Sequence, residues 1–400
     1  MQHNYITISL GLPEFVVERV EETEHLIEIW VRKADPVALC PRCGHPTDAF
    51  HDERIDDVWD VPLLGKGVRL WVTKRRFWCT HLGCEQDQPF TESFESLALG
   101  QHRTHRLEQY IYRLTKRMTH TDVVKELASY HIPISDNTVG RIHRRLAQAE
   151  EAERELQASE VIGIDEYSIK KQHTYATIIT DLINRQVVET FEKRDKETVT
   201  RHLEQLPHKE AIEAVVIDMS GSFRSAVQEA LPGRAIVADK FHVIARVIKA
   251  LDEVRKRVQC AKPKGERNSI FRLRYRLRKG REKLKAEEAA ELDAFLDQEA
   301  ELRVAYQLKE AFRDLYGLPG REEAEHQLEA WCDQALASGL PEMAQVVETL
   351  HDWWTEILNY FTWRYTNGFT EGKNSRIKVL KRRGYGYRNF DNFRLHILAA

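Results

Sequence analysis

The chain has 400 residues, enough for about two to four domains, and its 60 basic and 63 acidic residues nearly cancel. Net charge therefore excludes no class of partner, but the charge is zoned: residues 246–285 hold sixteen basic and four acidic side chains, and residues 287–301 are strongly acidic. No apolar run approaches the roughly 20 residues that span a bilayer, and no signal-peptide pattern opens the chain. We expect a soluble, cytoplasmic protein whose six cysteines are reduced.

The first part of the chain, residues 1–98, combines predicted strands with two pairs of cysteines. Apolar and polar residues alternate up to about Val31, which is typical of strands. The closely spaced pairs that follow are Cys40 with Cys43 and Cys79 with Cys84. Such pairs suit a tetrahedral structural Zn²⁺ site, in which His45 or His81 could replace one thiolate. Unrelated reduced thiols are the alternative.

Residues 99–158 are predicted to form a helix-turn-helix and a helical linker. Thr121-Asp122 can cap a first helix, a proline-containing break follows at residues 131–134, and Ser135-Asp136 can start a second helix. The second helix would present base-reading and phosphate-holding side chains, namely Asn137, Thr138, Arg141, Arg144 and Arg145. Helix pairs of this kind also occur in purely structural helical cores. The acidic, alanine-rich stretch at residues 148–160 then marks a domain boundary.

Two short apolar runs beyond that linker each lead into an aspartate. Residues 161–166 place Asp165 at the end of a predicted buried strand, and residues 214–219 do the same for Asp218. An unpaired buried carboxylate costs several kcal/mol, so two of them together favour a shared divalent cation. The alternative is that each aspartate only caps the element that follows it.

The order of the elements predicts a mixed sheet over residues 159–244. Strands at 161–166, 175–181 and 186–192 precede a helix at 196–206, and strands at 214–219 and 234–239 follow. This order is typical of a ribonuclease-H-like sheet, in which the first and fourth strands are neighbours and would bring Asp165 beside Asp218. Asp165 and Glu166 must point to opposite faces; Asp165 shares a face with Gly163, which leaves room beside it, but Glu166 remains a competitor.

The rest of the chain is predicted to be helical. Residues 245–365 show almost no strand pattern and form a large helical insertion, whose basic stretch at 246–285 is either a phosphate-binding surface or an ordinary solvated face. Residues 366–400 return to the catalytic core with a helix that begins near Glu371. Asn374 and Lys378 share the face of that glutamate, at i+3 and i+7. The fold class is thus multidomain α+β.

Taken in order, these motifs resemble the bacterial insertion-sequence transposases of the DDE type, in the ISL-three family. The motifs are Gly163-Ile-Asp165-Glu-Tyr, Val216-Ile-Asp218-Met-Ser, Ala238-Asp239-Lys-Phe-His242 and Asn367-Gly-x-x-Glu371-Gly-x-Asn374-x-x-Ile-Lys378. The resemblance covers essentially the whole chain. It implies an acidic triad of Asp165, Asp218 and Glu371, with Asp239 and His242 as an accessory pair beside it.

The resemblance also implies a mechanism and partners. Three carboxylates would hold two Mg²⁺ or Mn²⁺ ions, which activate the attacking oxygen and stabilise the leaving one at phosphorus. Cleavage at an element end would expose a 3′-OH that attacks target DNA, with Asn374 and Lys378 supporting the metal ligands or the DNA. The amino-terminal domains would recognise the terminal inverted repeats of the element. The protein would act as a homodimer or higher oligomer on double-stranded DNA, associated with the nucleoid and not with a membrane.

Two other classes of protein remain open. A zinc-containing DNA-binding regulator, or an inactive transposase copy, would bind DNA without depending on Mg²⁺. A structure-directed nuclease or resolvase would use the same acids on branched or hybrid substrates and would not transfer strands. Neither the sequence of the repeats nor the pathway of transposition follows from the chain.

Overall fold

A computed structural model describes residues 10–98, 100, 102–153, 159–170, 174–384, 386–387 and 389–399. The chain divides into two compact units. The first unit comprises Met1–Arg154 and Arg383–Ala400, and the second comprises Glu155–Arg382. None of the described helices is both long and apolar enough to cross a membrane.

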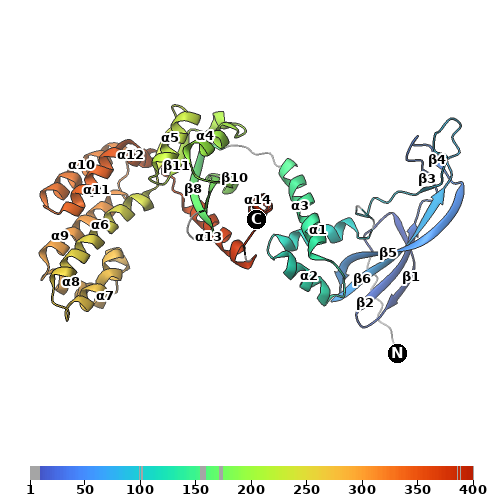
Figure 1. Cartoon of the computed structure of the whole chain (residues 1–400), viewed down its shortest axis with the longest axis horizontal. Coiled ribbons are helices and arrows are strands. Elements are labelled where there is room, and N and C mark those ends of the chain that lie inside the picture. The colour runs from blue at the N-terminus through green and yellow to red at the C-terminus, as the bar shows by residue number, and fades with distance from the viewer. Residues whose placement is uncertain are drawn as a thin grey trace. The chain divides into compact units, whose positions relative to one another are not determined.

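The first unit contains a sheet, and its first two strands lie where the alternation up to about Val31 predicts strands. Its order is β1 (Phe15–Glu22), β2 (Leu26–Lys33), β6 (Lys66–Phe77) and β5 (Phe50–Leu63), and the short strand β7 (Phe90–Thr91) also pairs with β6 (Figure 1). Val31, Val58, Leu70 and Val72 are fully buried on one face. A small hairpin of β3 (Ala38–Leu39) and β4 (Pro46–Thr47) carries the first cysteine pair.

A helical part completes the first unit. It contains α1 (His105–Thr115), α2 (His120–Ser129), α3 (Asp136–Glu153) and α14 (Phe390–Leu398), and α14 packs against α3. The two helices predicted around the break at 131–134 are present. The first of them begins at His120, before the expected cap at Thr121-Asp122, because the hydroxyl of Thr119 accepts the backbone N–H of Asp122 and caps the helix. Part of the expected linker lies at 154–158, outside the described residues.

The second unit is built on a five-stranded mixed sheet in the order β10, β9, β8, β11, β12. Its strands are β8 (Val161–Lys170), β9 (Thr174–Asp181), β10 (Gln186–Glu192), β11 (Ala214–Ile217) and β12 (Ala235–Ala238). The first three are antiparallel, and β8, β11 and β12 are parallel to one another. The first and fourth strands are therefore neighbours, as predicted. Helices α4 (Lys196–Glu204) and α5 (Gly221–Ala230) flank β11 in the chain.

Strand β8 is longer than the sequence predicts. Asp165 was expected at its carboxyl end, but the strand continues to Lys170. The reason is the hairpin with β9, whose pairing runs on to Lys170 and Thr174, whereas the last recorded pair between β8 and β11 is Gly163 with Val216. Asp165 therefore lies inside a strand, at the level where the neighbouring strand has ended.

A run of seven helices separates β12 from the last helix of the unit, α13 (Gly368–Arg383). They are α6 (Lys240–Ala261), α7 (Arg267–Arg278), α8 (Ala286–Leu296), α9 (Ala300–Leu315), α10 (Arg321–Ala337), α11 (Pro341–Asp352) and α12 (Trp354–Trp363) (Figure 1). The insertion is helical as predicted, although α6 begins five residues before the expected boundary of 245. Its tryptophans belong to the core: Trp331 is buried and donates its indole N–H to the carbonyl of Leu308 at 2.8 Å.

Ion pairs inside the helical insertion explain the zoned charge of the sequence. Arg257 pairs with Glu301 and Glu342, and Arg281 forms a two-fold contact with Asp293. Part of the basic stretch at 246–285 is thus bound to acidic side chains of the same insertion. These pairs are largely exposed, so each contributes little to stability. They nevertheless reduce the charge that this stretch could offer to a phosphate backbone.

Candidate functional site

Three aspartates follow or lie on neighbouring parallel strands at the same level of the sheet. The last recorded pair of β8 and β11 is Gly163 with Val216, and the same register extended by two residues places Asp218 opposite Asp165. The last recorded pair of β11 and β12 is Ile217 with Ala238, and the residues that follow them are Asp218 and Asp239. Residues in register on neighbouring parallel strands point to the same face. The topology therefore gathers three carboxylates where β11 and β12 end.

The environment of these acids disfavours negative charge. Asp165 and Asp239 are buried and Asp218 is half-buried. Burial raises the pKa of Asp218 to about 6, and the nearby charge of Asp165 adds to the increase. Burial and the charge of Glu371 likewise raise the pKa of Asp239 to about 6, and the pKa of Asp165 is raised mainly by burial. Crowded, desolvated carboxylates of this kind are stabilised by a bound cation.

Several oxygens at the site have no hydrogen-bond partner among the described residues. They are Oδ1 of Asp218, both carboxylate oxygens of Asp239 and Oδ1 of Asn374. Buried polar atoms are normally satisfied, so a cluster of free oxygens calls for a ligand. Carboxylate and amide oxygens are the donors that Mg²⁺ and Mn²⁺ prefer. The residues present therefore fit a divalent cation.

Helix α13 brings Glu371, the third acid of the predicted triad, to this edge of the sheet. It begins at Gly368, earlier than the predicted start near Glu371. Asn374 is buried and donates from Nδ2 to Asp165 Oδ2 at 2.9 Å and to the carbonyl of Glu166 at 3.3 Å. The helix face shared by Glu371 and Asn374 thus meets β8. Lys378 on the same face is exposed, and the described residues record no hydrogen bond or ion pair for it.

Glu371 lies closest to the accessory pair. One oxygen of Glu371 is 3.9 Å from Nε2 of His242, and that nitrogen is 4.0 Å from Oδ2 of Asp239. The ligand atoms of these three residues all lie within 4.8 Å of one another. Asp165 and Asp218 do not belong to this group of three. The structure therefore places the predicted triad and the accessory pair in one acidic region, with Glu371 nearest Asp239.

The competing acid, Glu166, has a different partner from Asp165. Its carboxylate accepts two hydrogen bonds from Nη1 of Arg194, at 2.7 and 2.5 Å. Its charge still contributes to the raised pKa values of Asp165 and Asp218. Glu166 is thus an ion-paired neighbour of the acids, whereas Asp165 is bound to Asn374.

Asn367 is a positioning residue that the sequence did not reveal. It is 1% exposed and donates from Nδ2 to the carbonyl of Ile164 at 3.0 Å and to that of Val216 at 3.5 Å, so it joins β8 to β11. A Cβ on Gly163 would lie 2.4 Å from its Oδ1. The expectation that Gly163 leaves free room beside Asp165 was wrong, because Asn367 fills that space. The motif contained Asn367, but a contact over about two hundred residues leaves no local signal.

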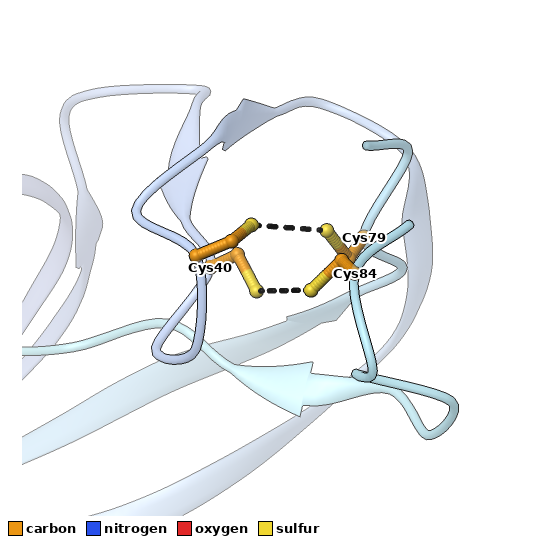
Figure 2. Close-up of side chains that lie close together, drawn as sticks. Cys40, Cys79 and Cys84 are labelled. Atoms are coloured by element: carbon orange, nitrogen blue, oxygen red, sulfur yellow. Dashed lines mark hydrogen bonds between the residues drawn. The ribbon is translucent and has the colours of Figure 1, made fainter. Parts of the chain in front are cut away.

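The four cysteines of the first unit converge on one point. Cys40 Sγ lies 3.8 Å from Cys84 Sγ, and Cys43 Sγ lies 3.7 Å from Cys79 Sγ; Figure 2 shows the two contacts side by side. All four sulfurs lie within 4.8 Å of one another. A tetrahedral Zn²⁺ with Zn–S bonds of about 2.3 Å separates its sulfurs by about 3.8 Å. The cysteines therefore fit structural zinc without either histidine.

The predicted DNA-reading residues of α3 differ in their surroundings. Asn137, Arg141 and Arg144 are exposed and Thr138 is half-buried. Arg145 contacts the buried carboxylate of Glu108 on α1. Arg145 thus connects α3 to α1. Arg141 donates to Thr138 Oγ1 of its own helix at 3.2 Å, which is the one hydrogen bond recorded for it among the described residues.

Comparisons with known proteins agree with this architecture. A family model named for ISL3 transposases and described as "Transposase" matches residues 162–397, and one described as "zinc-finger of transposase IS204/IS1001/IS1096/IS1165" matches residues 36–84. The transposase for insertion sequence element IS1001 of Bordetella parapertussis is 30% identical over 398 residues, which cover 98% of this chain and 96% of that protein.

Two shorter matches are also found. The transposase for insertion sequence element IS1557 of Mycobacterium tuberculosis is 28% identical over 253 residues, 57% of each chain. A Lactococcus lactis protein described as an ATP-dependent protease is 36% identical over 110 residues, 27% of this chain and 33% of that protein. A match over so small a share of both chains says little about the whole protein.

Replacing Gly163 tests the close packing of β8 against Asn367 beside Asp165. In Gly163→Ala the new methyl group meets Asn367, Thr370 and Thr180 within 3.0 Å, and we expect a loss of about 1–3 kcal/mol in unfolding free energy. Chemical denaturation followed by tryptophan fluorescence measures it. Gly221→Ala is the control, because a Cβ there meets nothing within 4 Å. If Gly163→Ala and Gly221→Ala lose the same unfolding free energy, these contacts are not the cause.

Replacing Cys40 tests the zinc site. Cys40→Ser removes one of four thiolates, so we expect the purified chain to lose one zinc ion relative to the wild type, measured by mass spectrometry of the metal. Cys260→Ser is the matched control, because Cys260 is exposed and lies outside the cluster. Equal zinc content in the two variants would contradict the assignment.

Proposed function

We infer the activity of this protein from its family: the chain belongs to the ISL-three (ISL3) family of insertion-sequence transposases. Membership makes it a DNA-processing enzyme with DNA as its partner. We propose that it binds the terminal inverted repeats of an insertion sequence, cleaves the 3′ ends and joins them to target DNA. The observation that supports the proposal is the register of β8 and β11, which brings Asp165 and Asp218 side by side. Burial and the neighbouring carboxylates at this edge of the sheet favour a bound cation.

The residues of the site have separate tasks in this proposal. Asp165, Asp218 and Glu371 would hold Mg²⁺ or Mn²⁺, which when bound activates the attacking oxygen and stabilises the leaving oxygen of an in-line displacement. Asn374 fixes one oxygen of Asp165 through its 2.9 Å hydrogen bond and leaves its own Oδ1 free. Asn367 holds β8 and β11 together behind the acids.

Asp239 and His242 support the third acid. Asp239 is fully buried at the amino end of α6. Its carboxylate and that of Glu371 both lie near Nε2 of His242, and their negative charges repel each other. An imidazole between two carboxylates can donate to one of them, and it becomes a cation if it accepts a proton. We propose that this pair sets the position of Glu371 beside the other acids.

We further propose that the mixed sheet is ribonuclease-H-like. The supporting observation is the strand order, with three antiparallel strands followed by two parallel ones and the acids on the first and fourth. The helices α6 to α12 then interrupt this core between β12 and α13, so that Glu371 arrives from a segment far along the chain.

The first unit is proposed to recognise the DNA ends. The family model for a transposase zinc finger covers the cysteines, and α2 and α3 follow as a pair separated by residues 130–135. If this pair is a helix-turn-helix, α3 enters the major groove with Arg141 and Arg144 outward. Two ends must be processed together, so we propose that the active form is a homodimer or a higher oligomer.

Cleavage of a duplex that carries the terminal repeat of the element tests the function. With Mg²⁺ we expect nicking at the repeat boundary. In Asp218→Asn we expect repeat binding to be retained and the cleavage rate to fall by more than about 100-fold. Loss of a residue that only supports a metal ligand costs up to about 100-fold, and Asp218 is proposed to be a ligand itself. Glu213→Gln, at the other end of β11 and exposed, should cleave normally.

The outcome of that experiment also separates the alternatives. If the wild type and both variants bind the repeat tightly but none of them cleaves it, even with Mn²⁺ and paired ends, the protein is a DNA-binding regulator or an inactive copy. Cleavage of branched substrates without strand transfer would indicate a nuclease or resolvase.

Replacing Arg141 tests the assignment of α3. Arg141→Ala should weaken binding to the repeat by about 1–3 kcal/mol if the guanidinium reads a base, and should relax the preference at that position. Fluorescence anisotropy at two salt concentrations measures the change. Lys125→Ala removes the same charge from an exposed position on α2. If both variants lose affinity equally for repeat and unrelated DNA, Arg141 does not read sequence.

A further inference from the structure

Three histidines from segments far apart in the chain meet inside the first unit. His120 is the first residue of α2, His143 lies in α3 and His396 lies in α14. Their ring centroids are 4.2 Å apart for His143 and His396, 5.5 Å for His120 and His143, and 5.7 Å for His120 and His396. One ring nitrogen of each lies within 4.8 Å of the others.

The hydrogen bonds around Thr115 fix how two of the rings carry their protons. The hydroxyl of Thr115 donates to the carbonyl of Tyr112, so it can only accept from Nδ1–H of His143, 2.8 Å away. The carbonyl of Thr115 accepts from Nε2–H of His396 at 2.7 Å. His143 Nε2 and His396 Nδ1 therefore carry lone pairs. A ring N–H bound to a backbone or hydroxyl oxygen, which leaves a lone pair on the other nitrogen, is typical of a metal-binding histidine.

Two of the ring nitrogens have no hydrogen-bond partner among the described residues. They are Nε2 of His143, whose side chain is nearly fully buried, and Nε2 of His120. Among the described residues, Nδ1 of His396 accepts from the hydroxyl of Tyr387, at 2.9 Å, and a metal bound to that nitrogen would replace this hydrogen bond. Burial also lowers the pKa of all three imidazoles, to about 3 for His143, so the rings are neutral, which is the form that binds metals.

The cluster borders on a cavity of about 350 Å³ that could hold a fourth ligand. His120, His143 and His396 line it together with Asp136 and Arg144. The charge of Asp136 acts on His120 and favours a cation there, and the charge of Arg144 opposes it. Zn²⁺ bound by three protein side chains commonly takes water as its fourth ligand.

We propose that His120, His143 and His396 bind a divalent transition-metal ion such as Zn²⁺, which joins α14 to the pair of helices α2 and α3. Neutral imidazoles select Zn²⁺, Co²⁺, Ni²⁺ or Cu²⁺ over the Mg²⁺ that the carboxylates of the second unit prefer. Zn–N bonds of about 2.1 Å place the nitrogens about 3.4 Å apart, so the rings rotate toward one another on binding. The helix that carries the proposed DNA-reading residues is then held to the carboxyl-terminal segment by a metal.

Metal content and X-ray absorption of the purified full-length chain test this site. Excess Mg²⁺ is present throughout, so that the carboxylates of the second unit do not hold zinc. In the wild type we expect two zinc ions per chain, with a mixed shell of sulfur at about 2.3 Å and nitrogen at about 2.1 Å. A single zinc ion with sulfur ligands alone would overturn the proposal without any variant, and would leave the histidines as core packing.

The variants separate the two zinc sites. His120→Ala, at a half-buried helix start, should lose one zinc ion and the nitrogen shell but keep the sulfur shell, whereas Cys40→Ser should do the reverse. His105→Ala is the matched control, because His105 is the exposed first residue of α1. Retention of the nitrogen shell in His120→Ala would also overturn the proposal.

Discussion

The carboxylates of Asp165, Asp218 and Asp239 repel one another, and the fold of the second unit holds them together against that repulsion. The register of β8, β11 and β12 fixes their level, and a slip of a single residue would turn the side chains to the other face. The residue before each acid is apolar and fully buried: Ile164, Ile217 and Ala238. Burial of the strands therefore keeps the acids close, and a bound cation relieves the repulsion that remains.

Much of this arrangement could be predicted because it follows from chain order. Apolar runs that end in aspartates identified the strands of Asp165 and Asp218, and the order of strands and helices predicted that they are neighbours. The length of β8 could not be predicted in the same way. It depends on the register of the hairpin with β9, which continues to Lys170 after pairing with β11 has ended.

Contacts between distant segments left no signal in the sequence. Asn367 fills the space beside Gly163, and a glycine alone does not reveal which side chain needs its missing Cβ. Arg145 has the residue type and the helix position expected of a DNA-reading residue, yet it is bound to the buried carboxylate of Glu108. Periodicity places His143 near the apolar face of α3 but cannot show that His120 and His396 meet it. In each case tertiary packing determines which residue a side chain contacts, whereas the local sequence pattern predicts only the helix or strand that carries it.

The proposed function requires the edge of the sheet between Asp165 and Asp218 to bind the catalytic cation. Crystals of the wild-type chain with Mn²⁺, measured at the manganese absorption edge, test it directly. We expect an anomalous peak within bonding distance of both carboxylates, about 2.1–2.3 Å from the nearest oxygens. A peak confined to Asp239, His242 and Glu371, or no peak in the second unit, would contradict it.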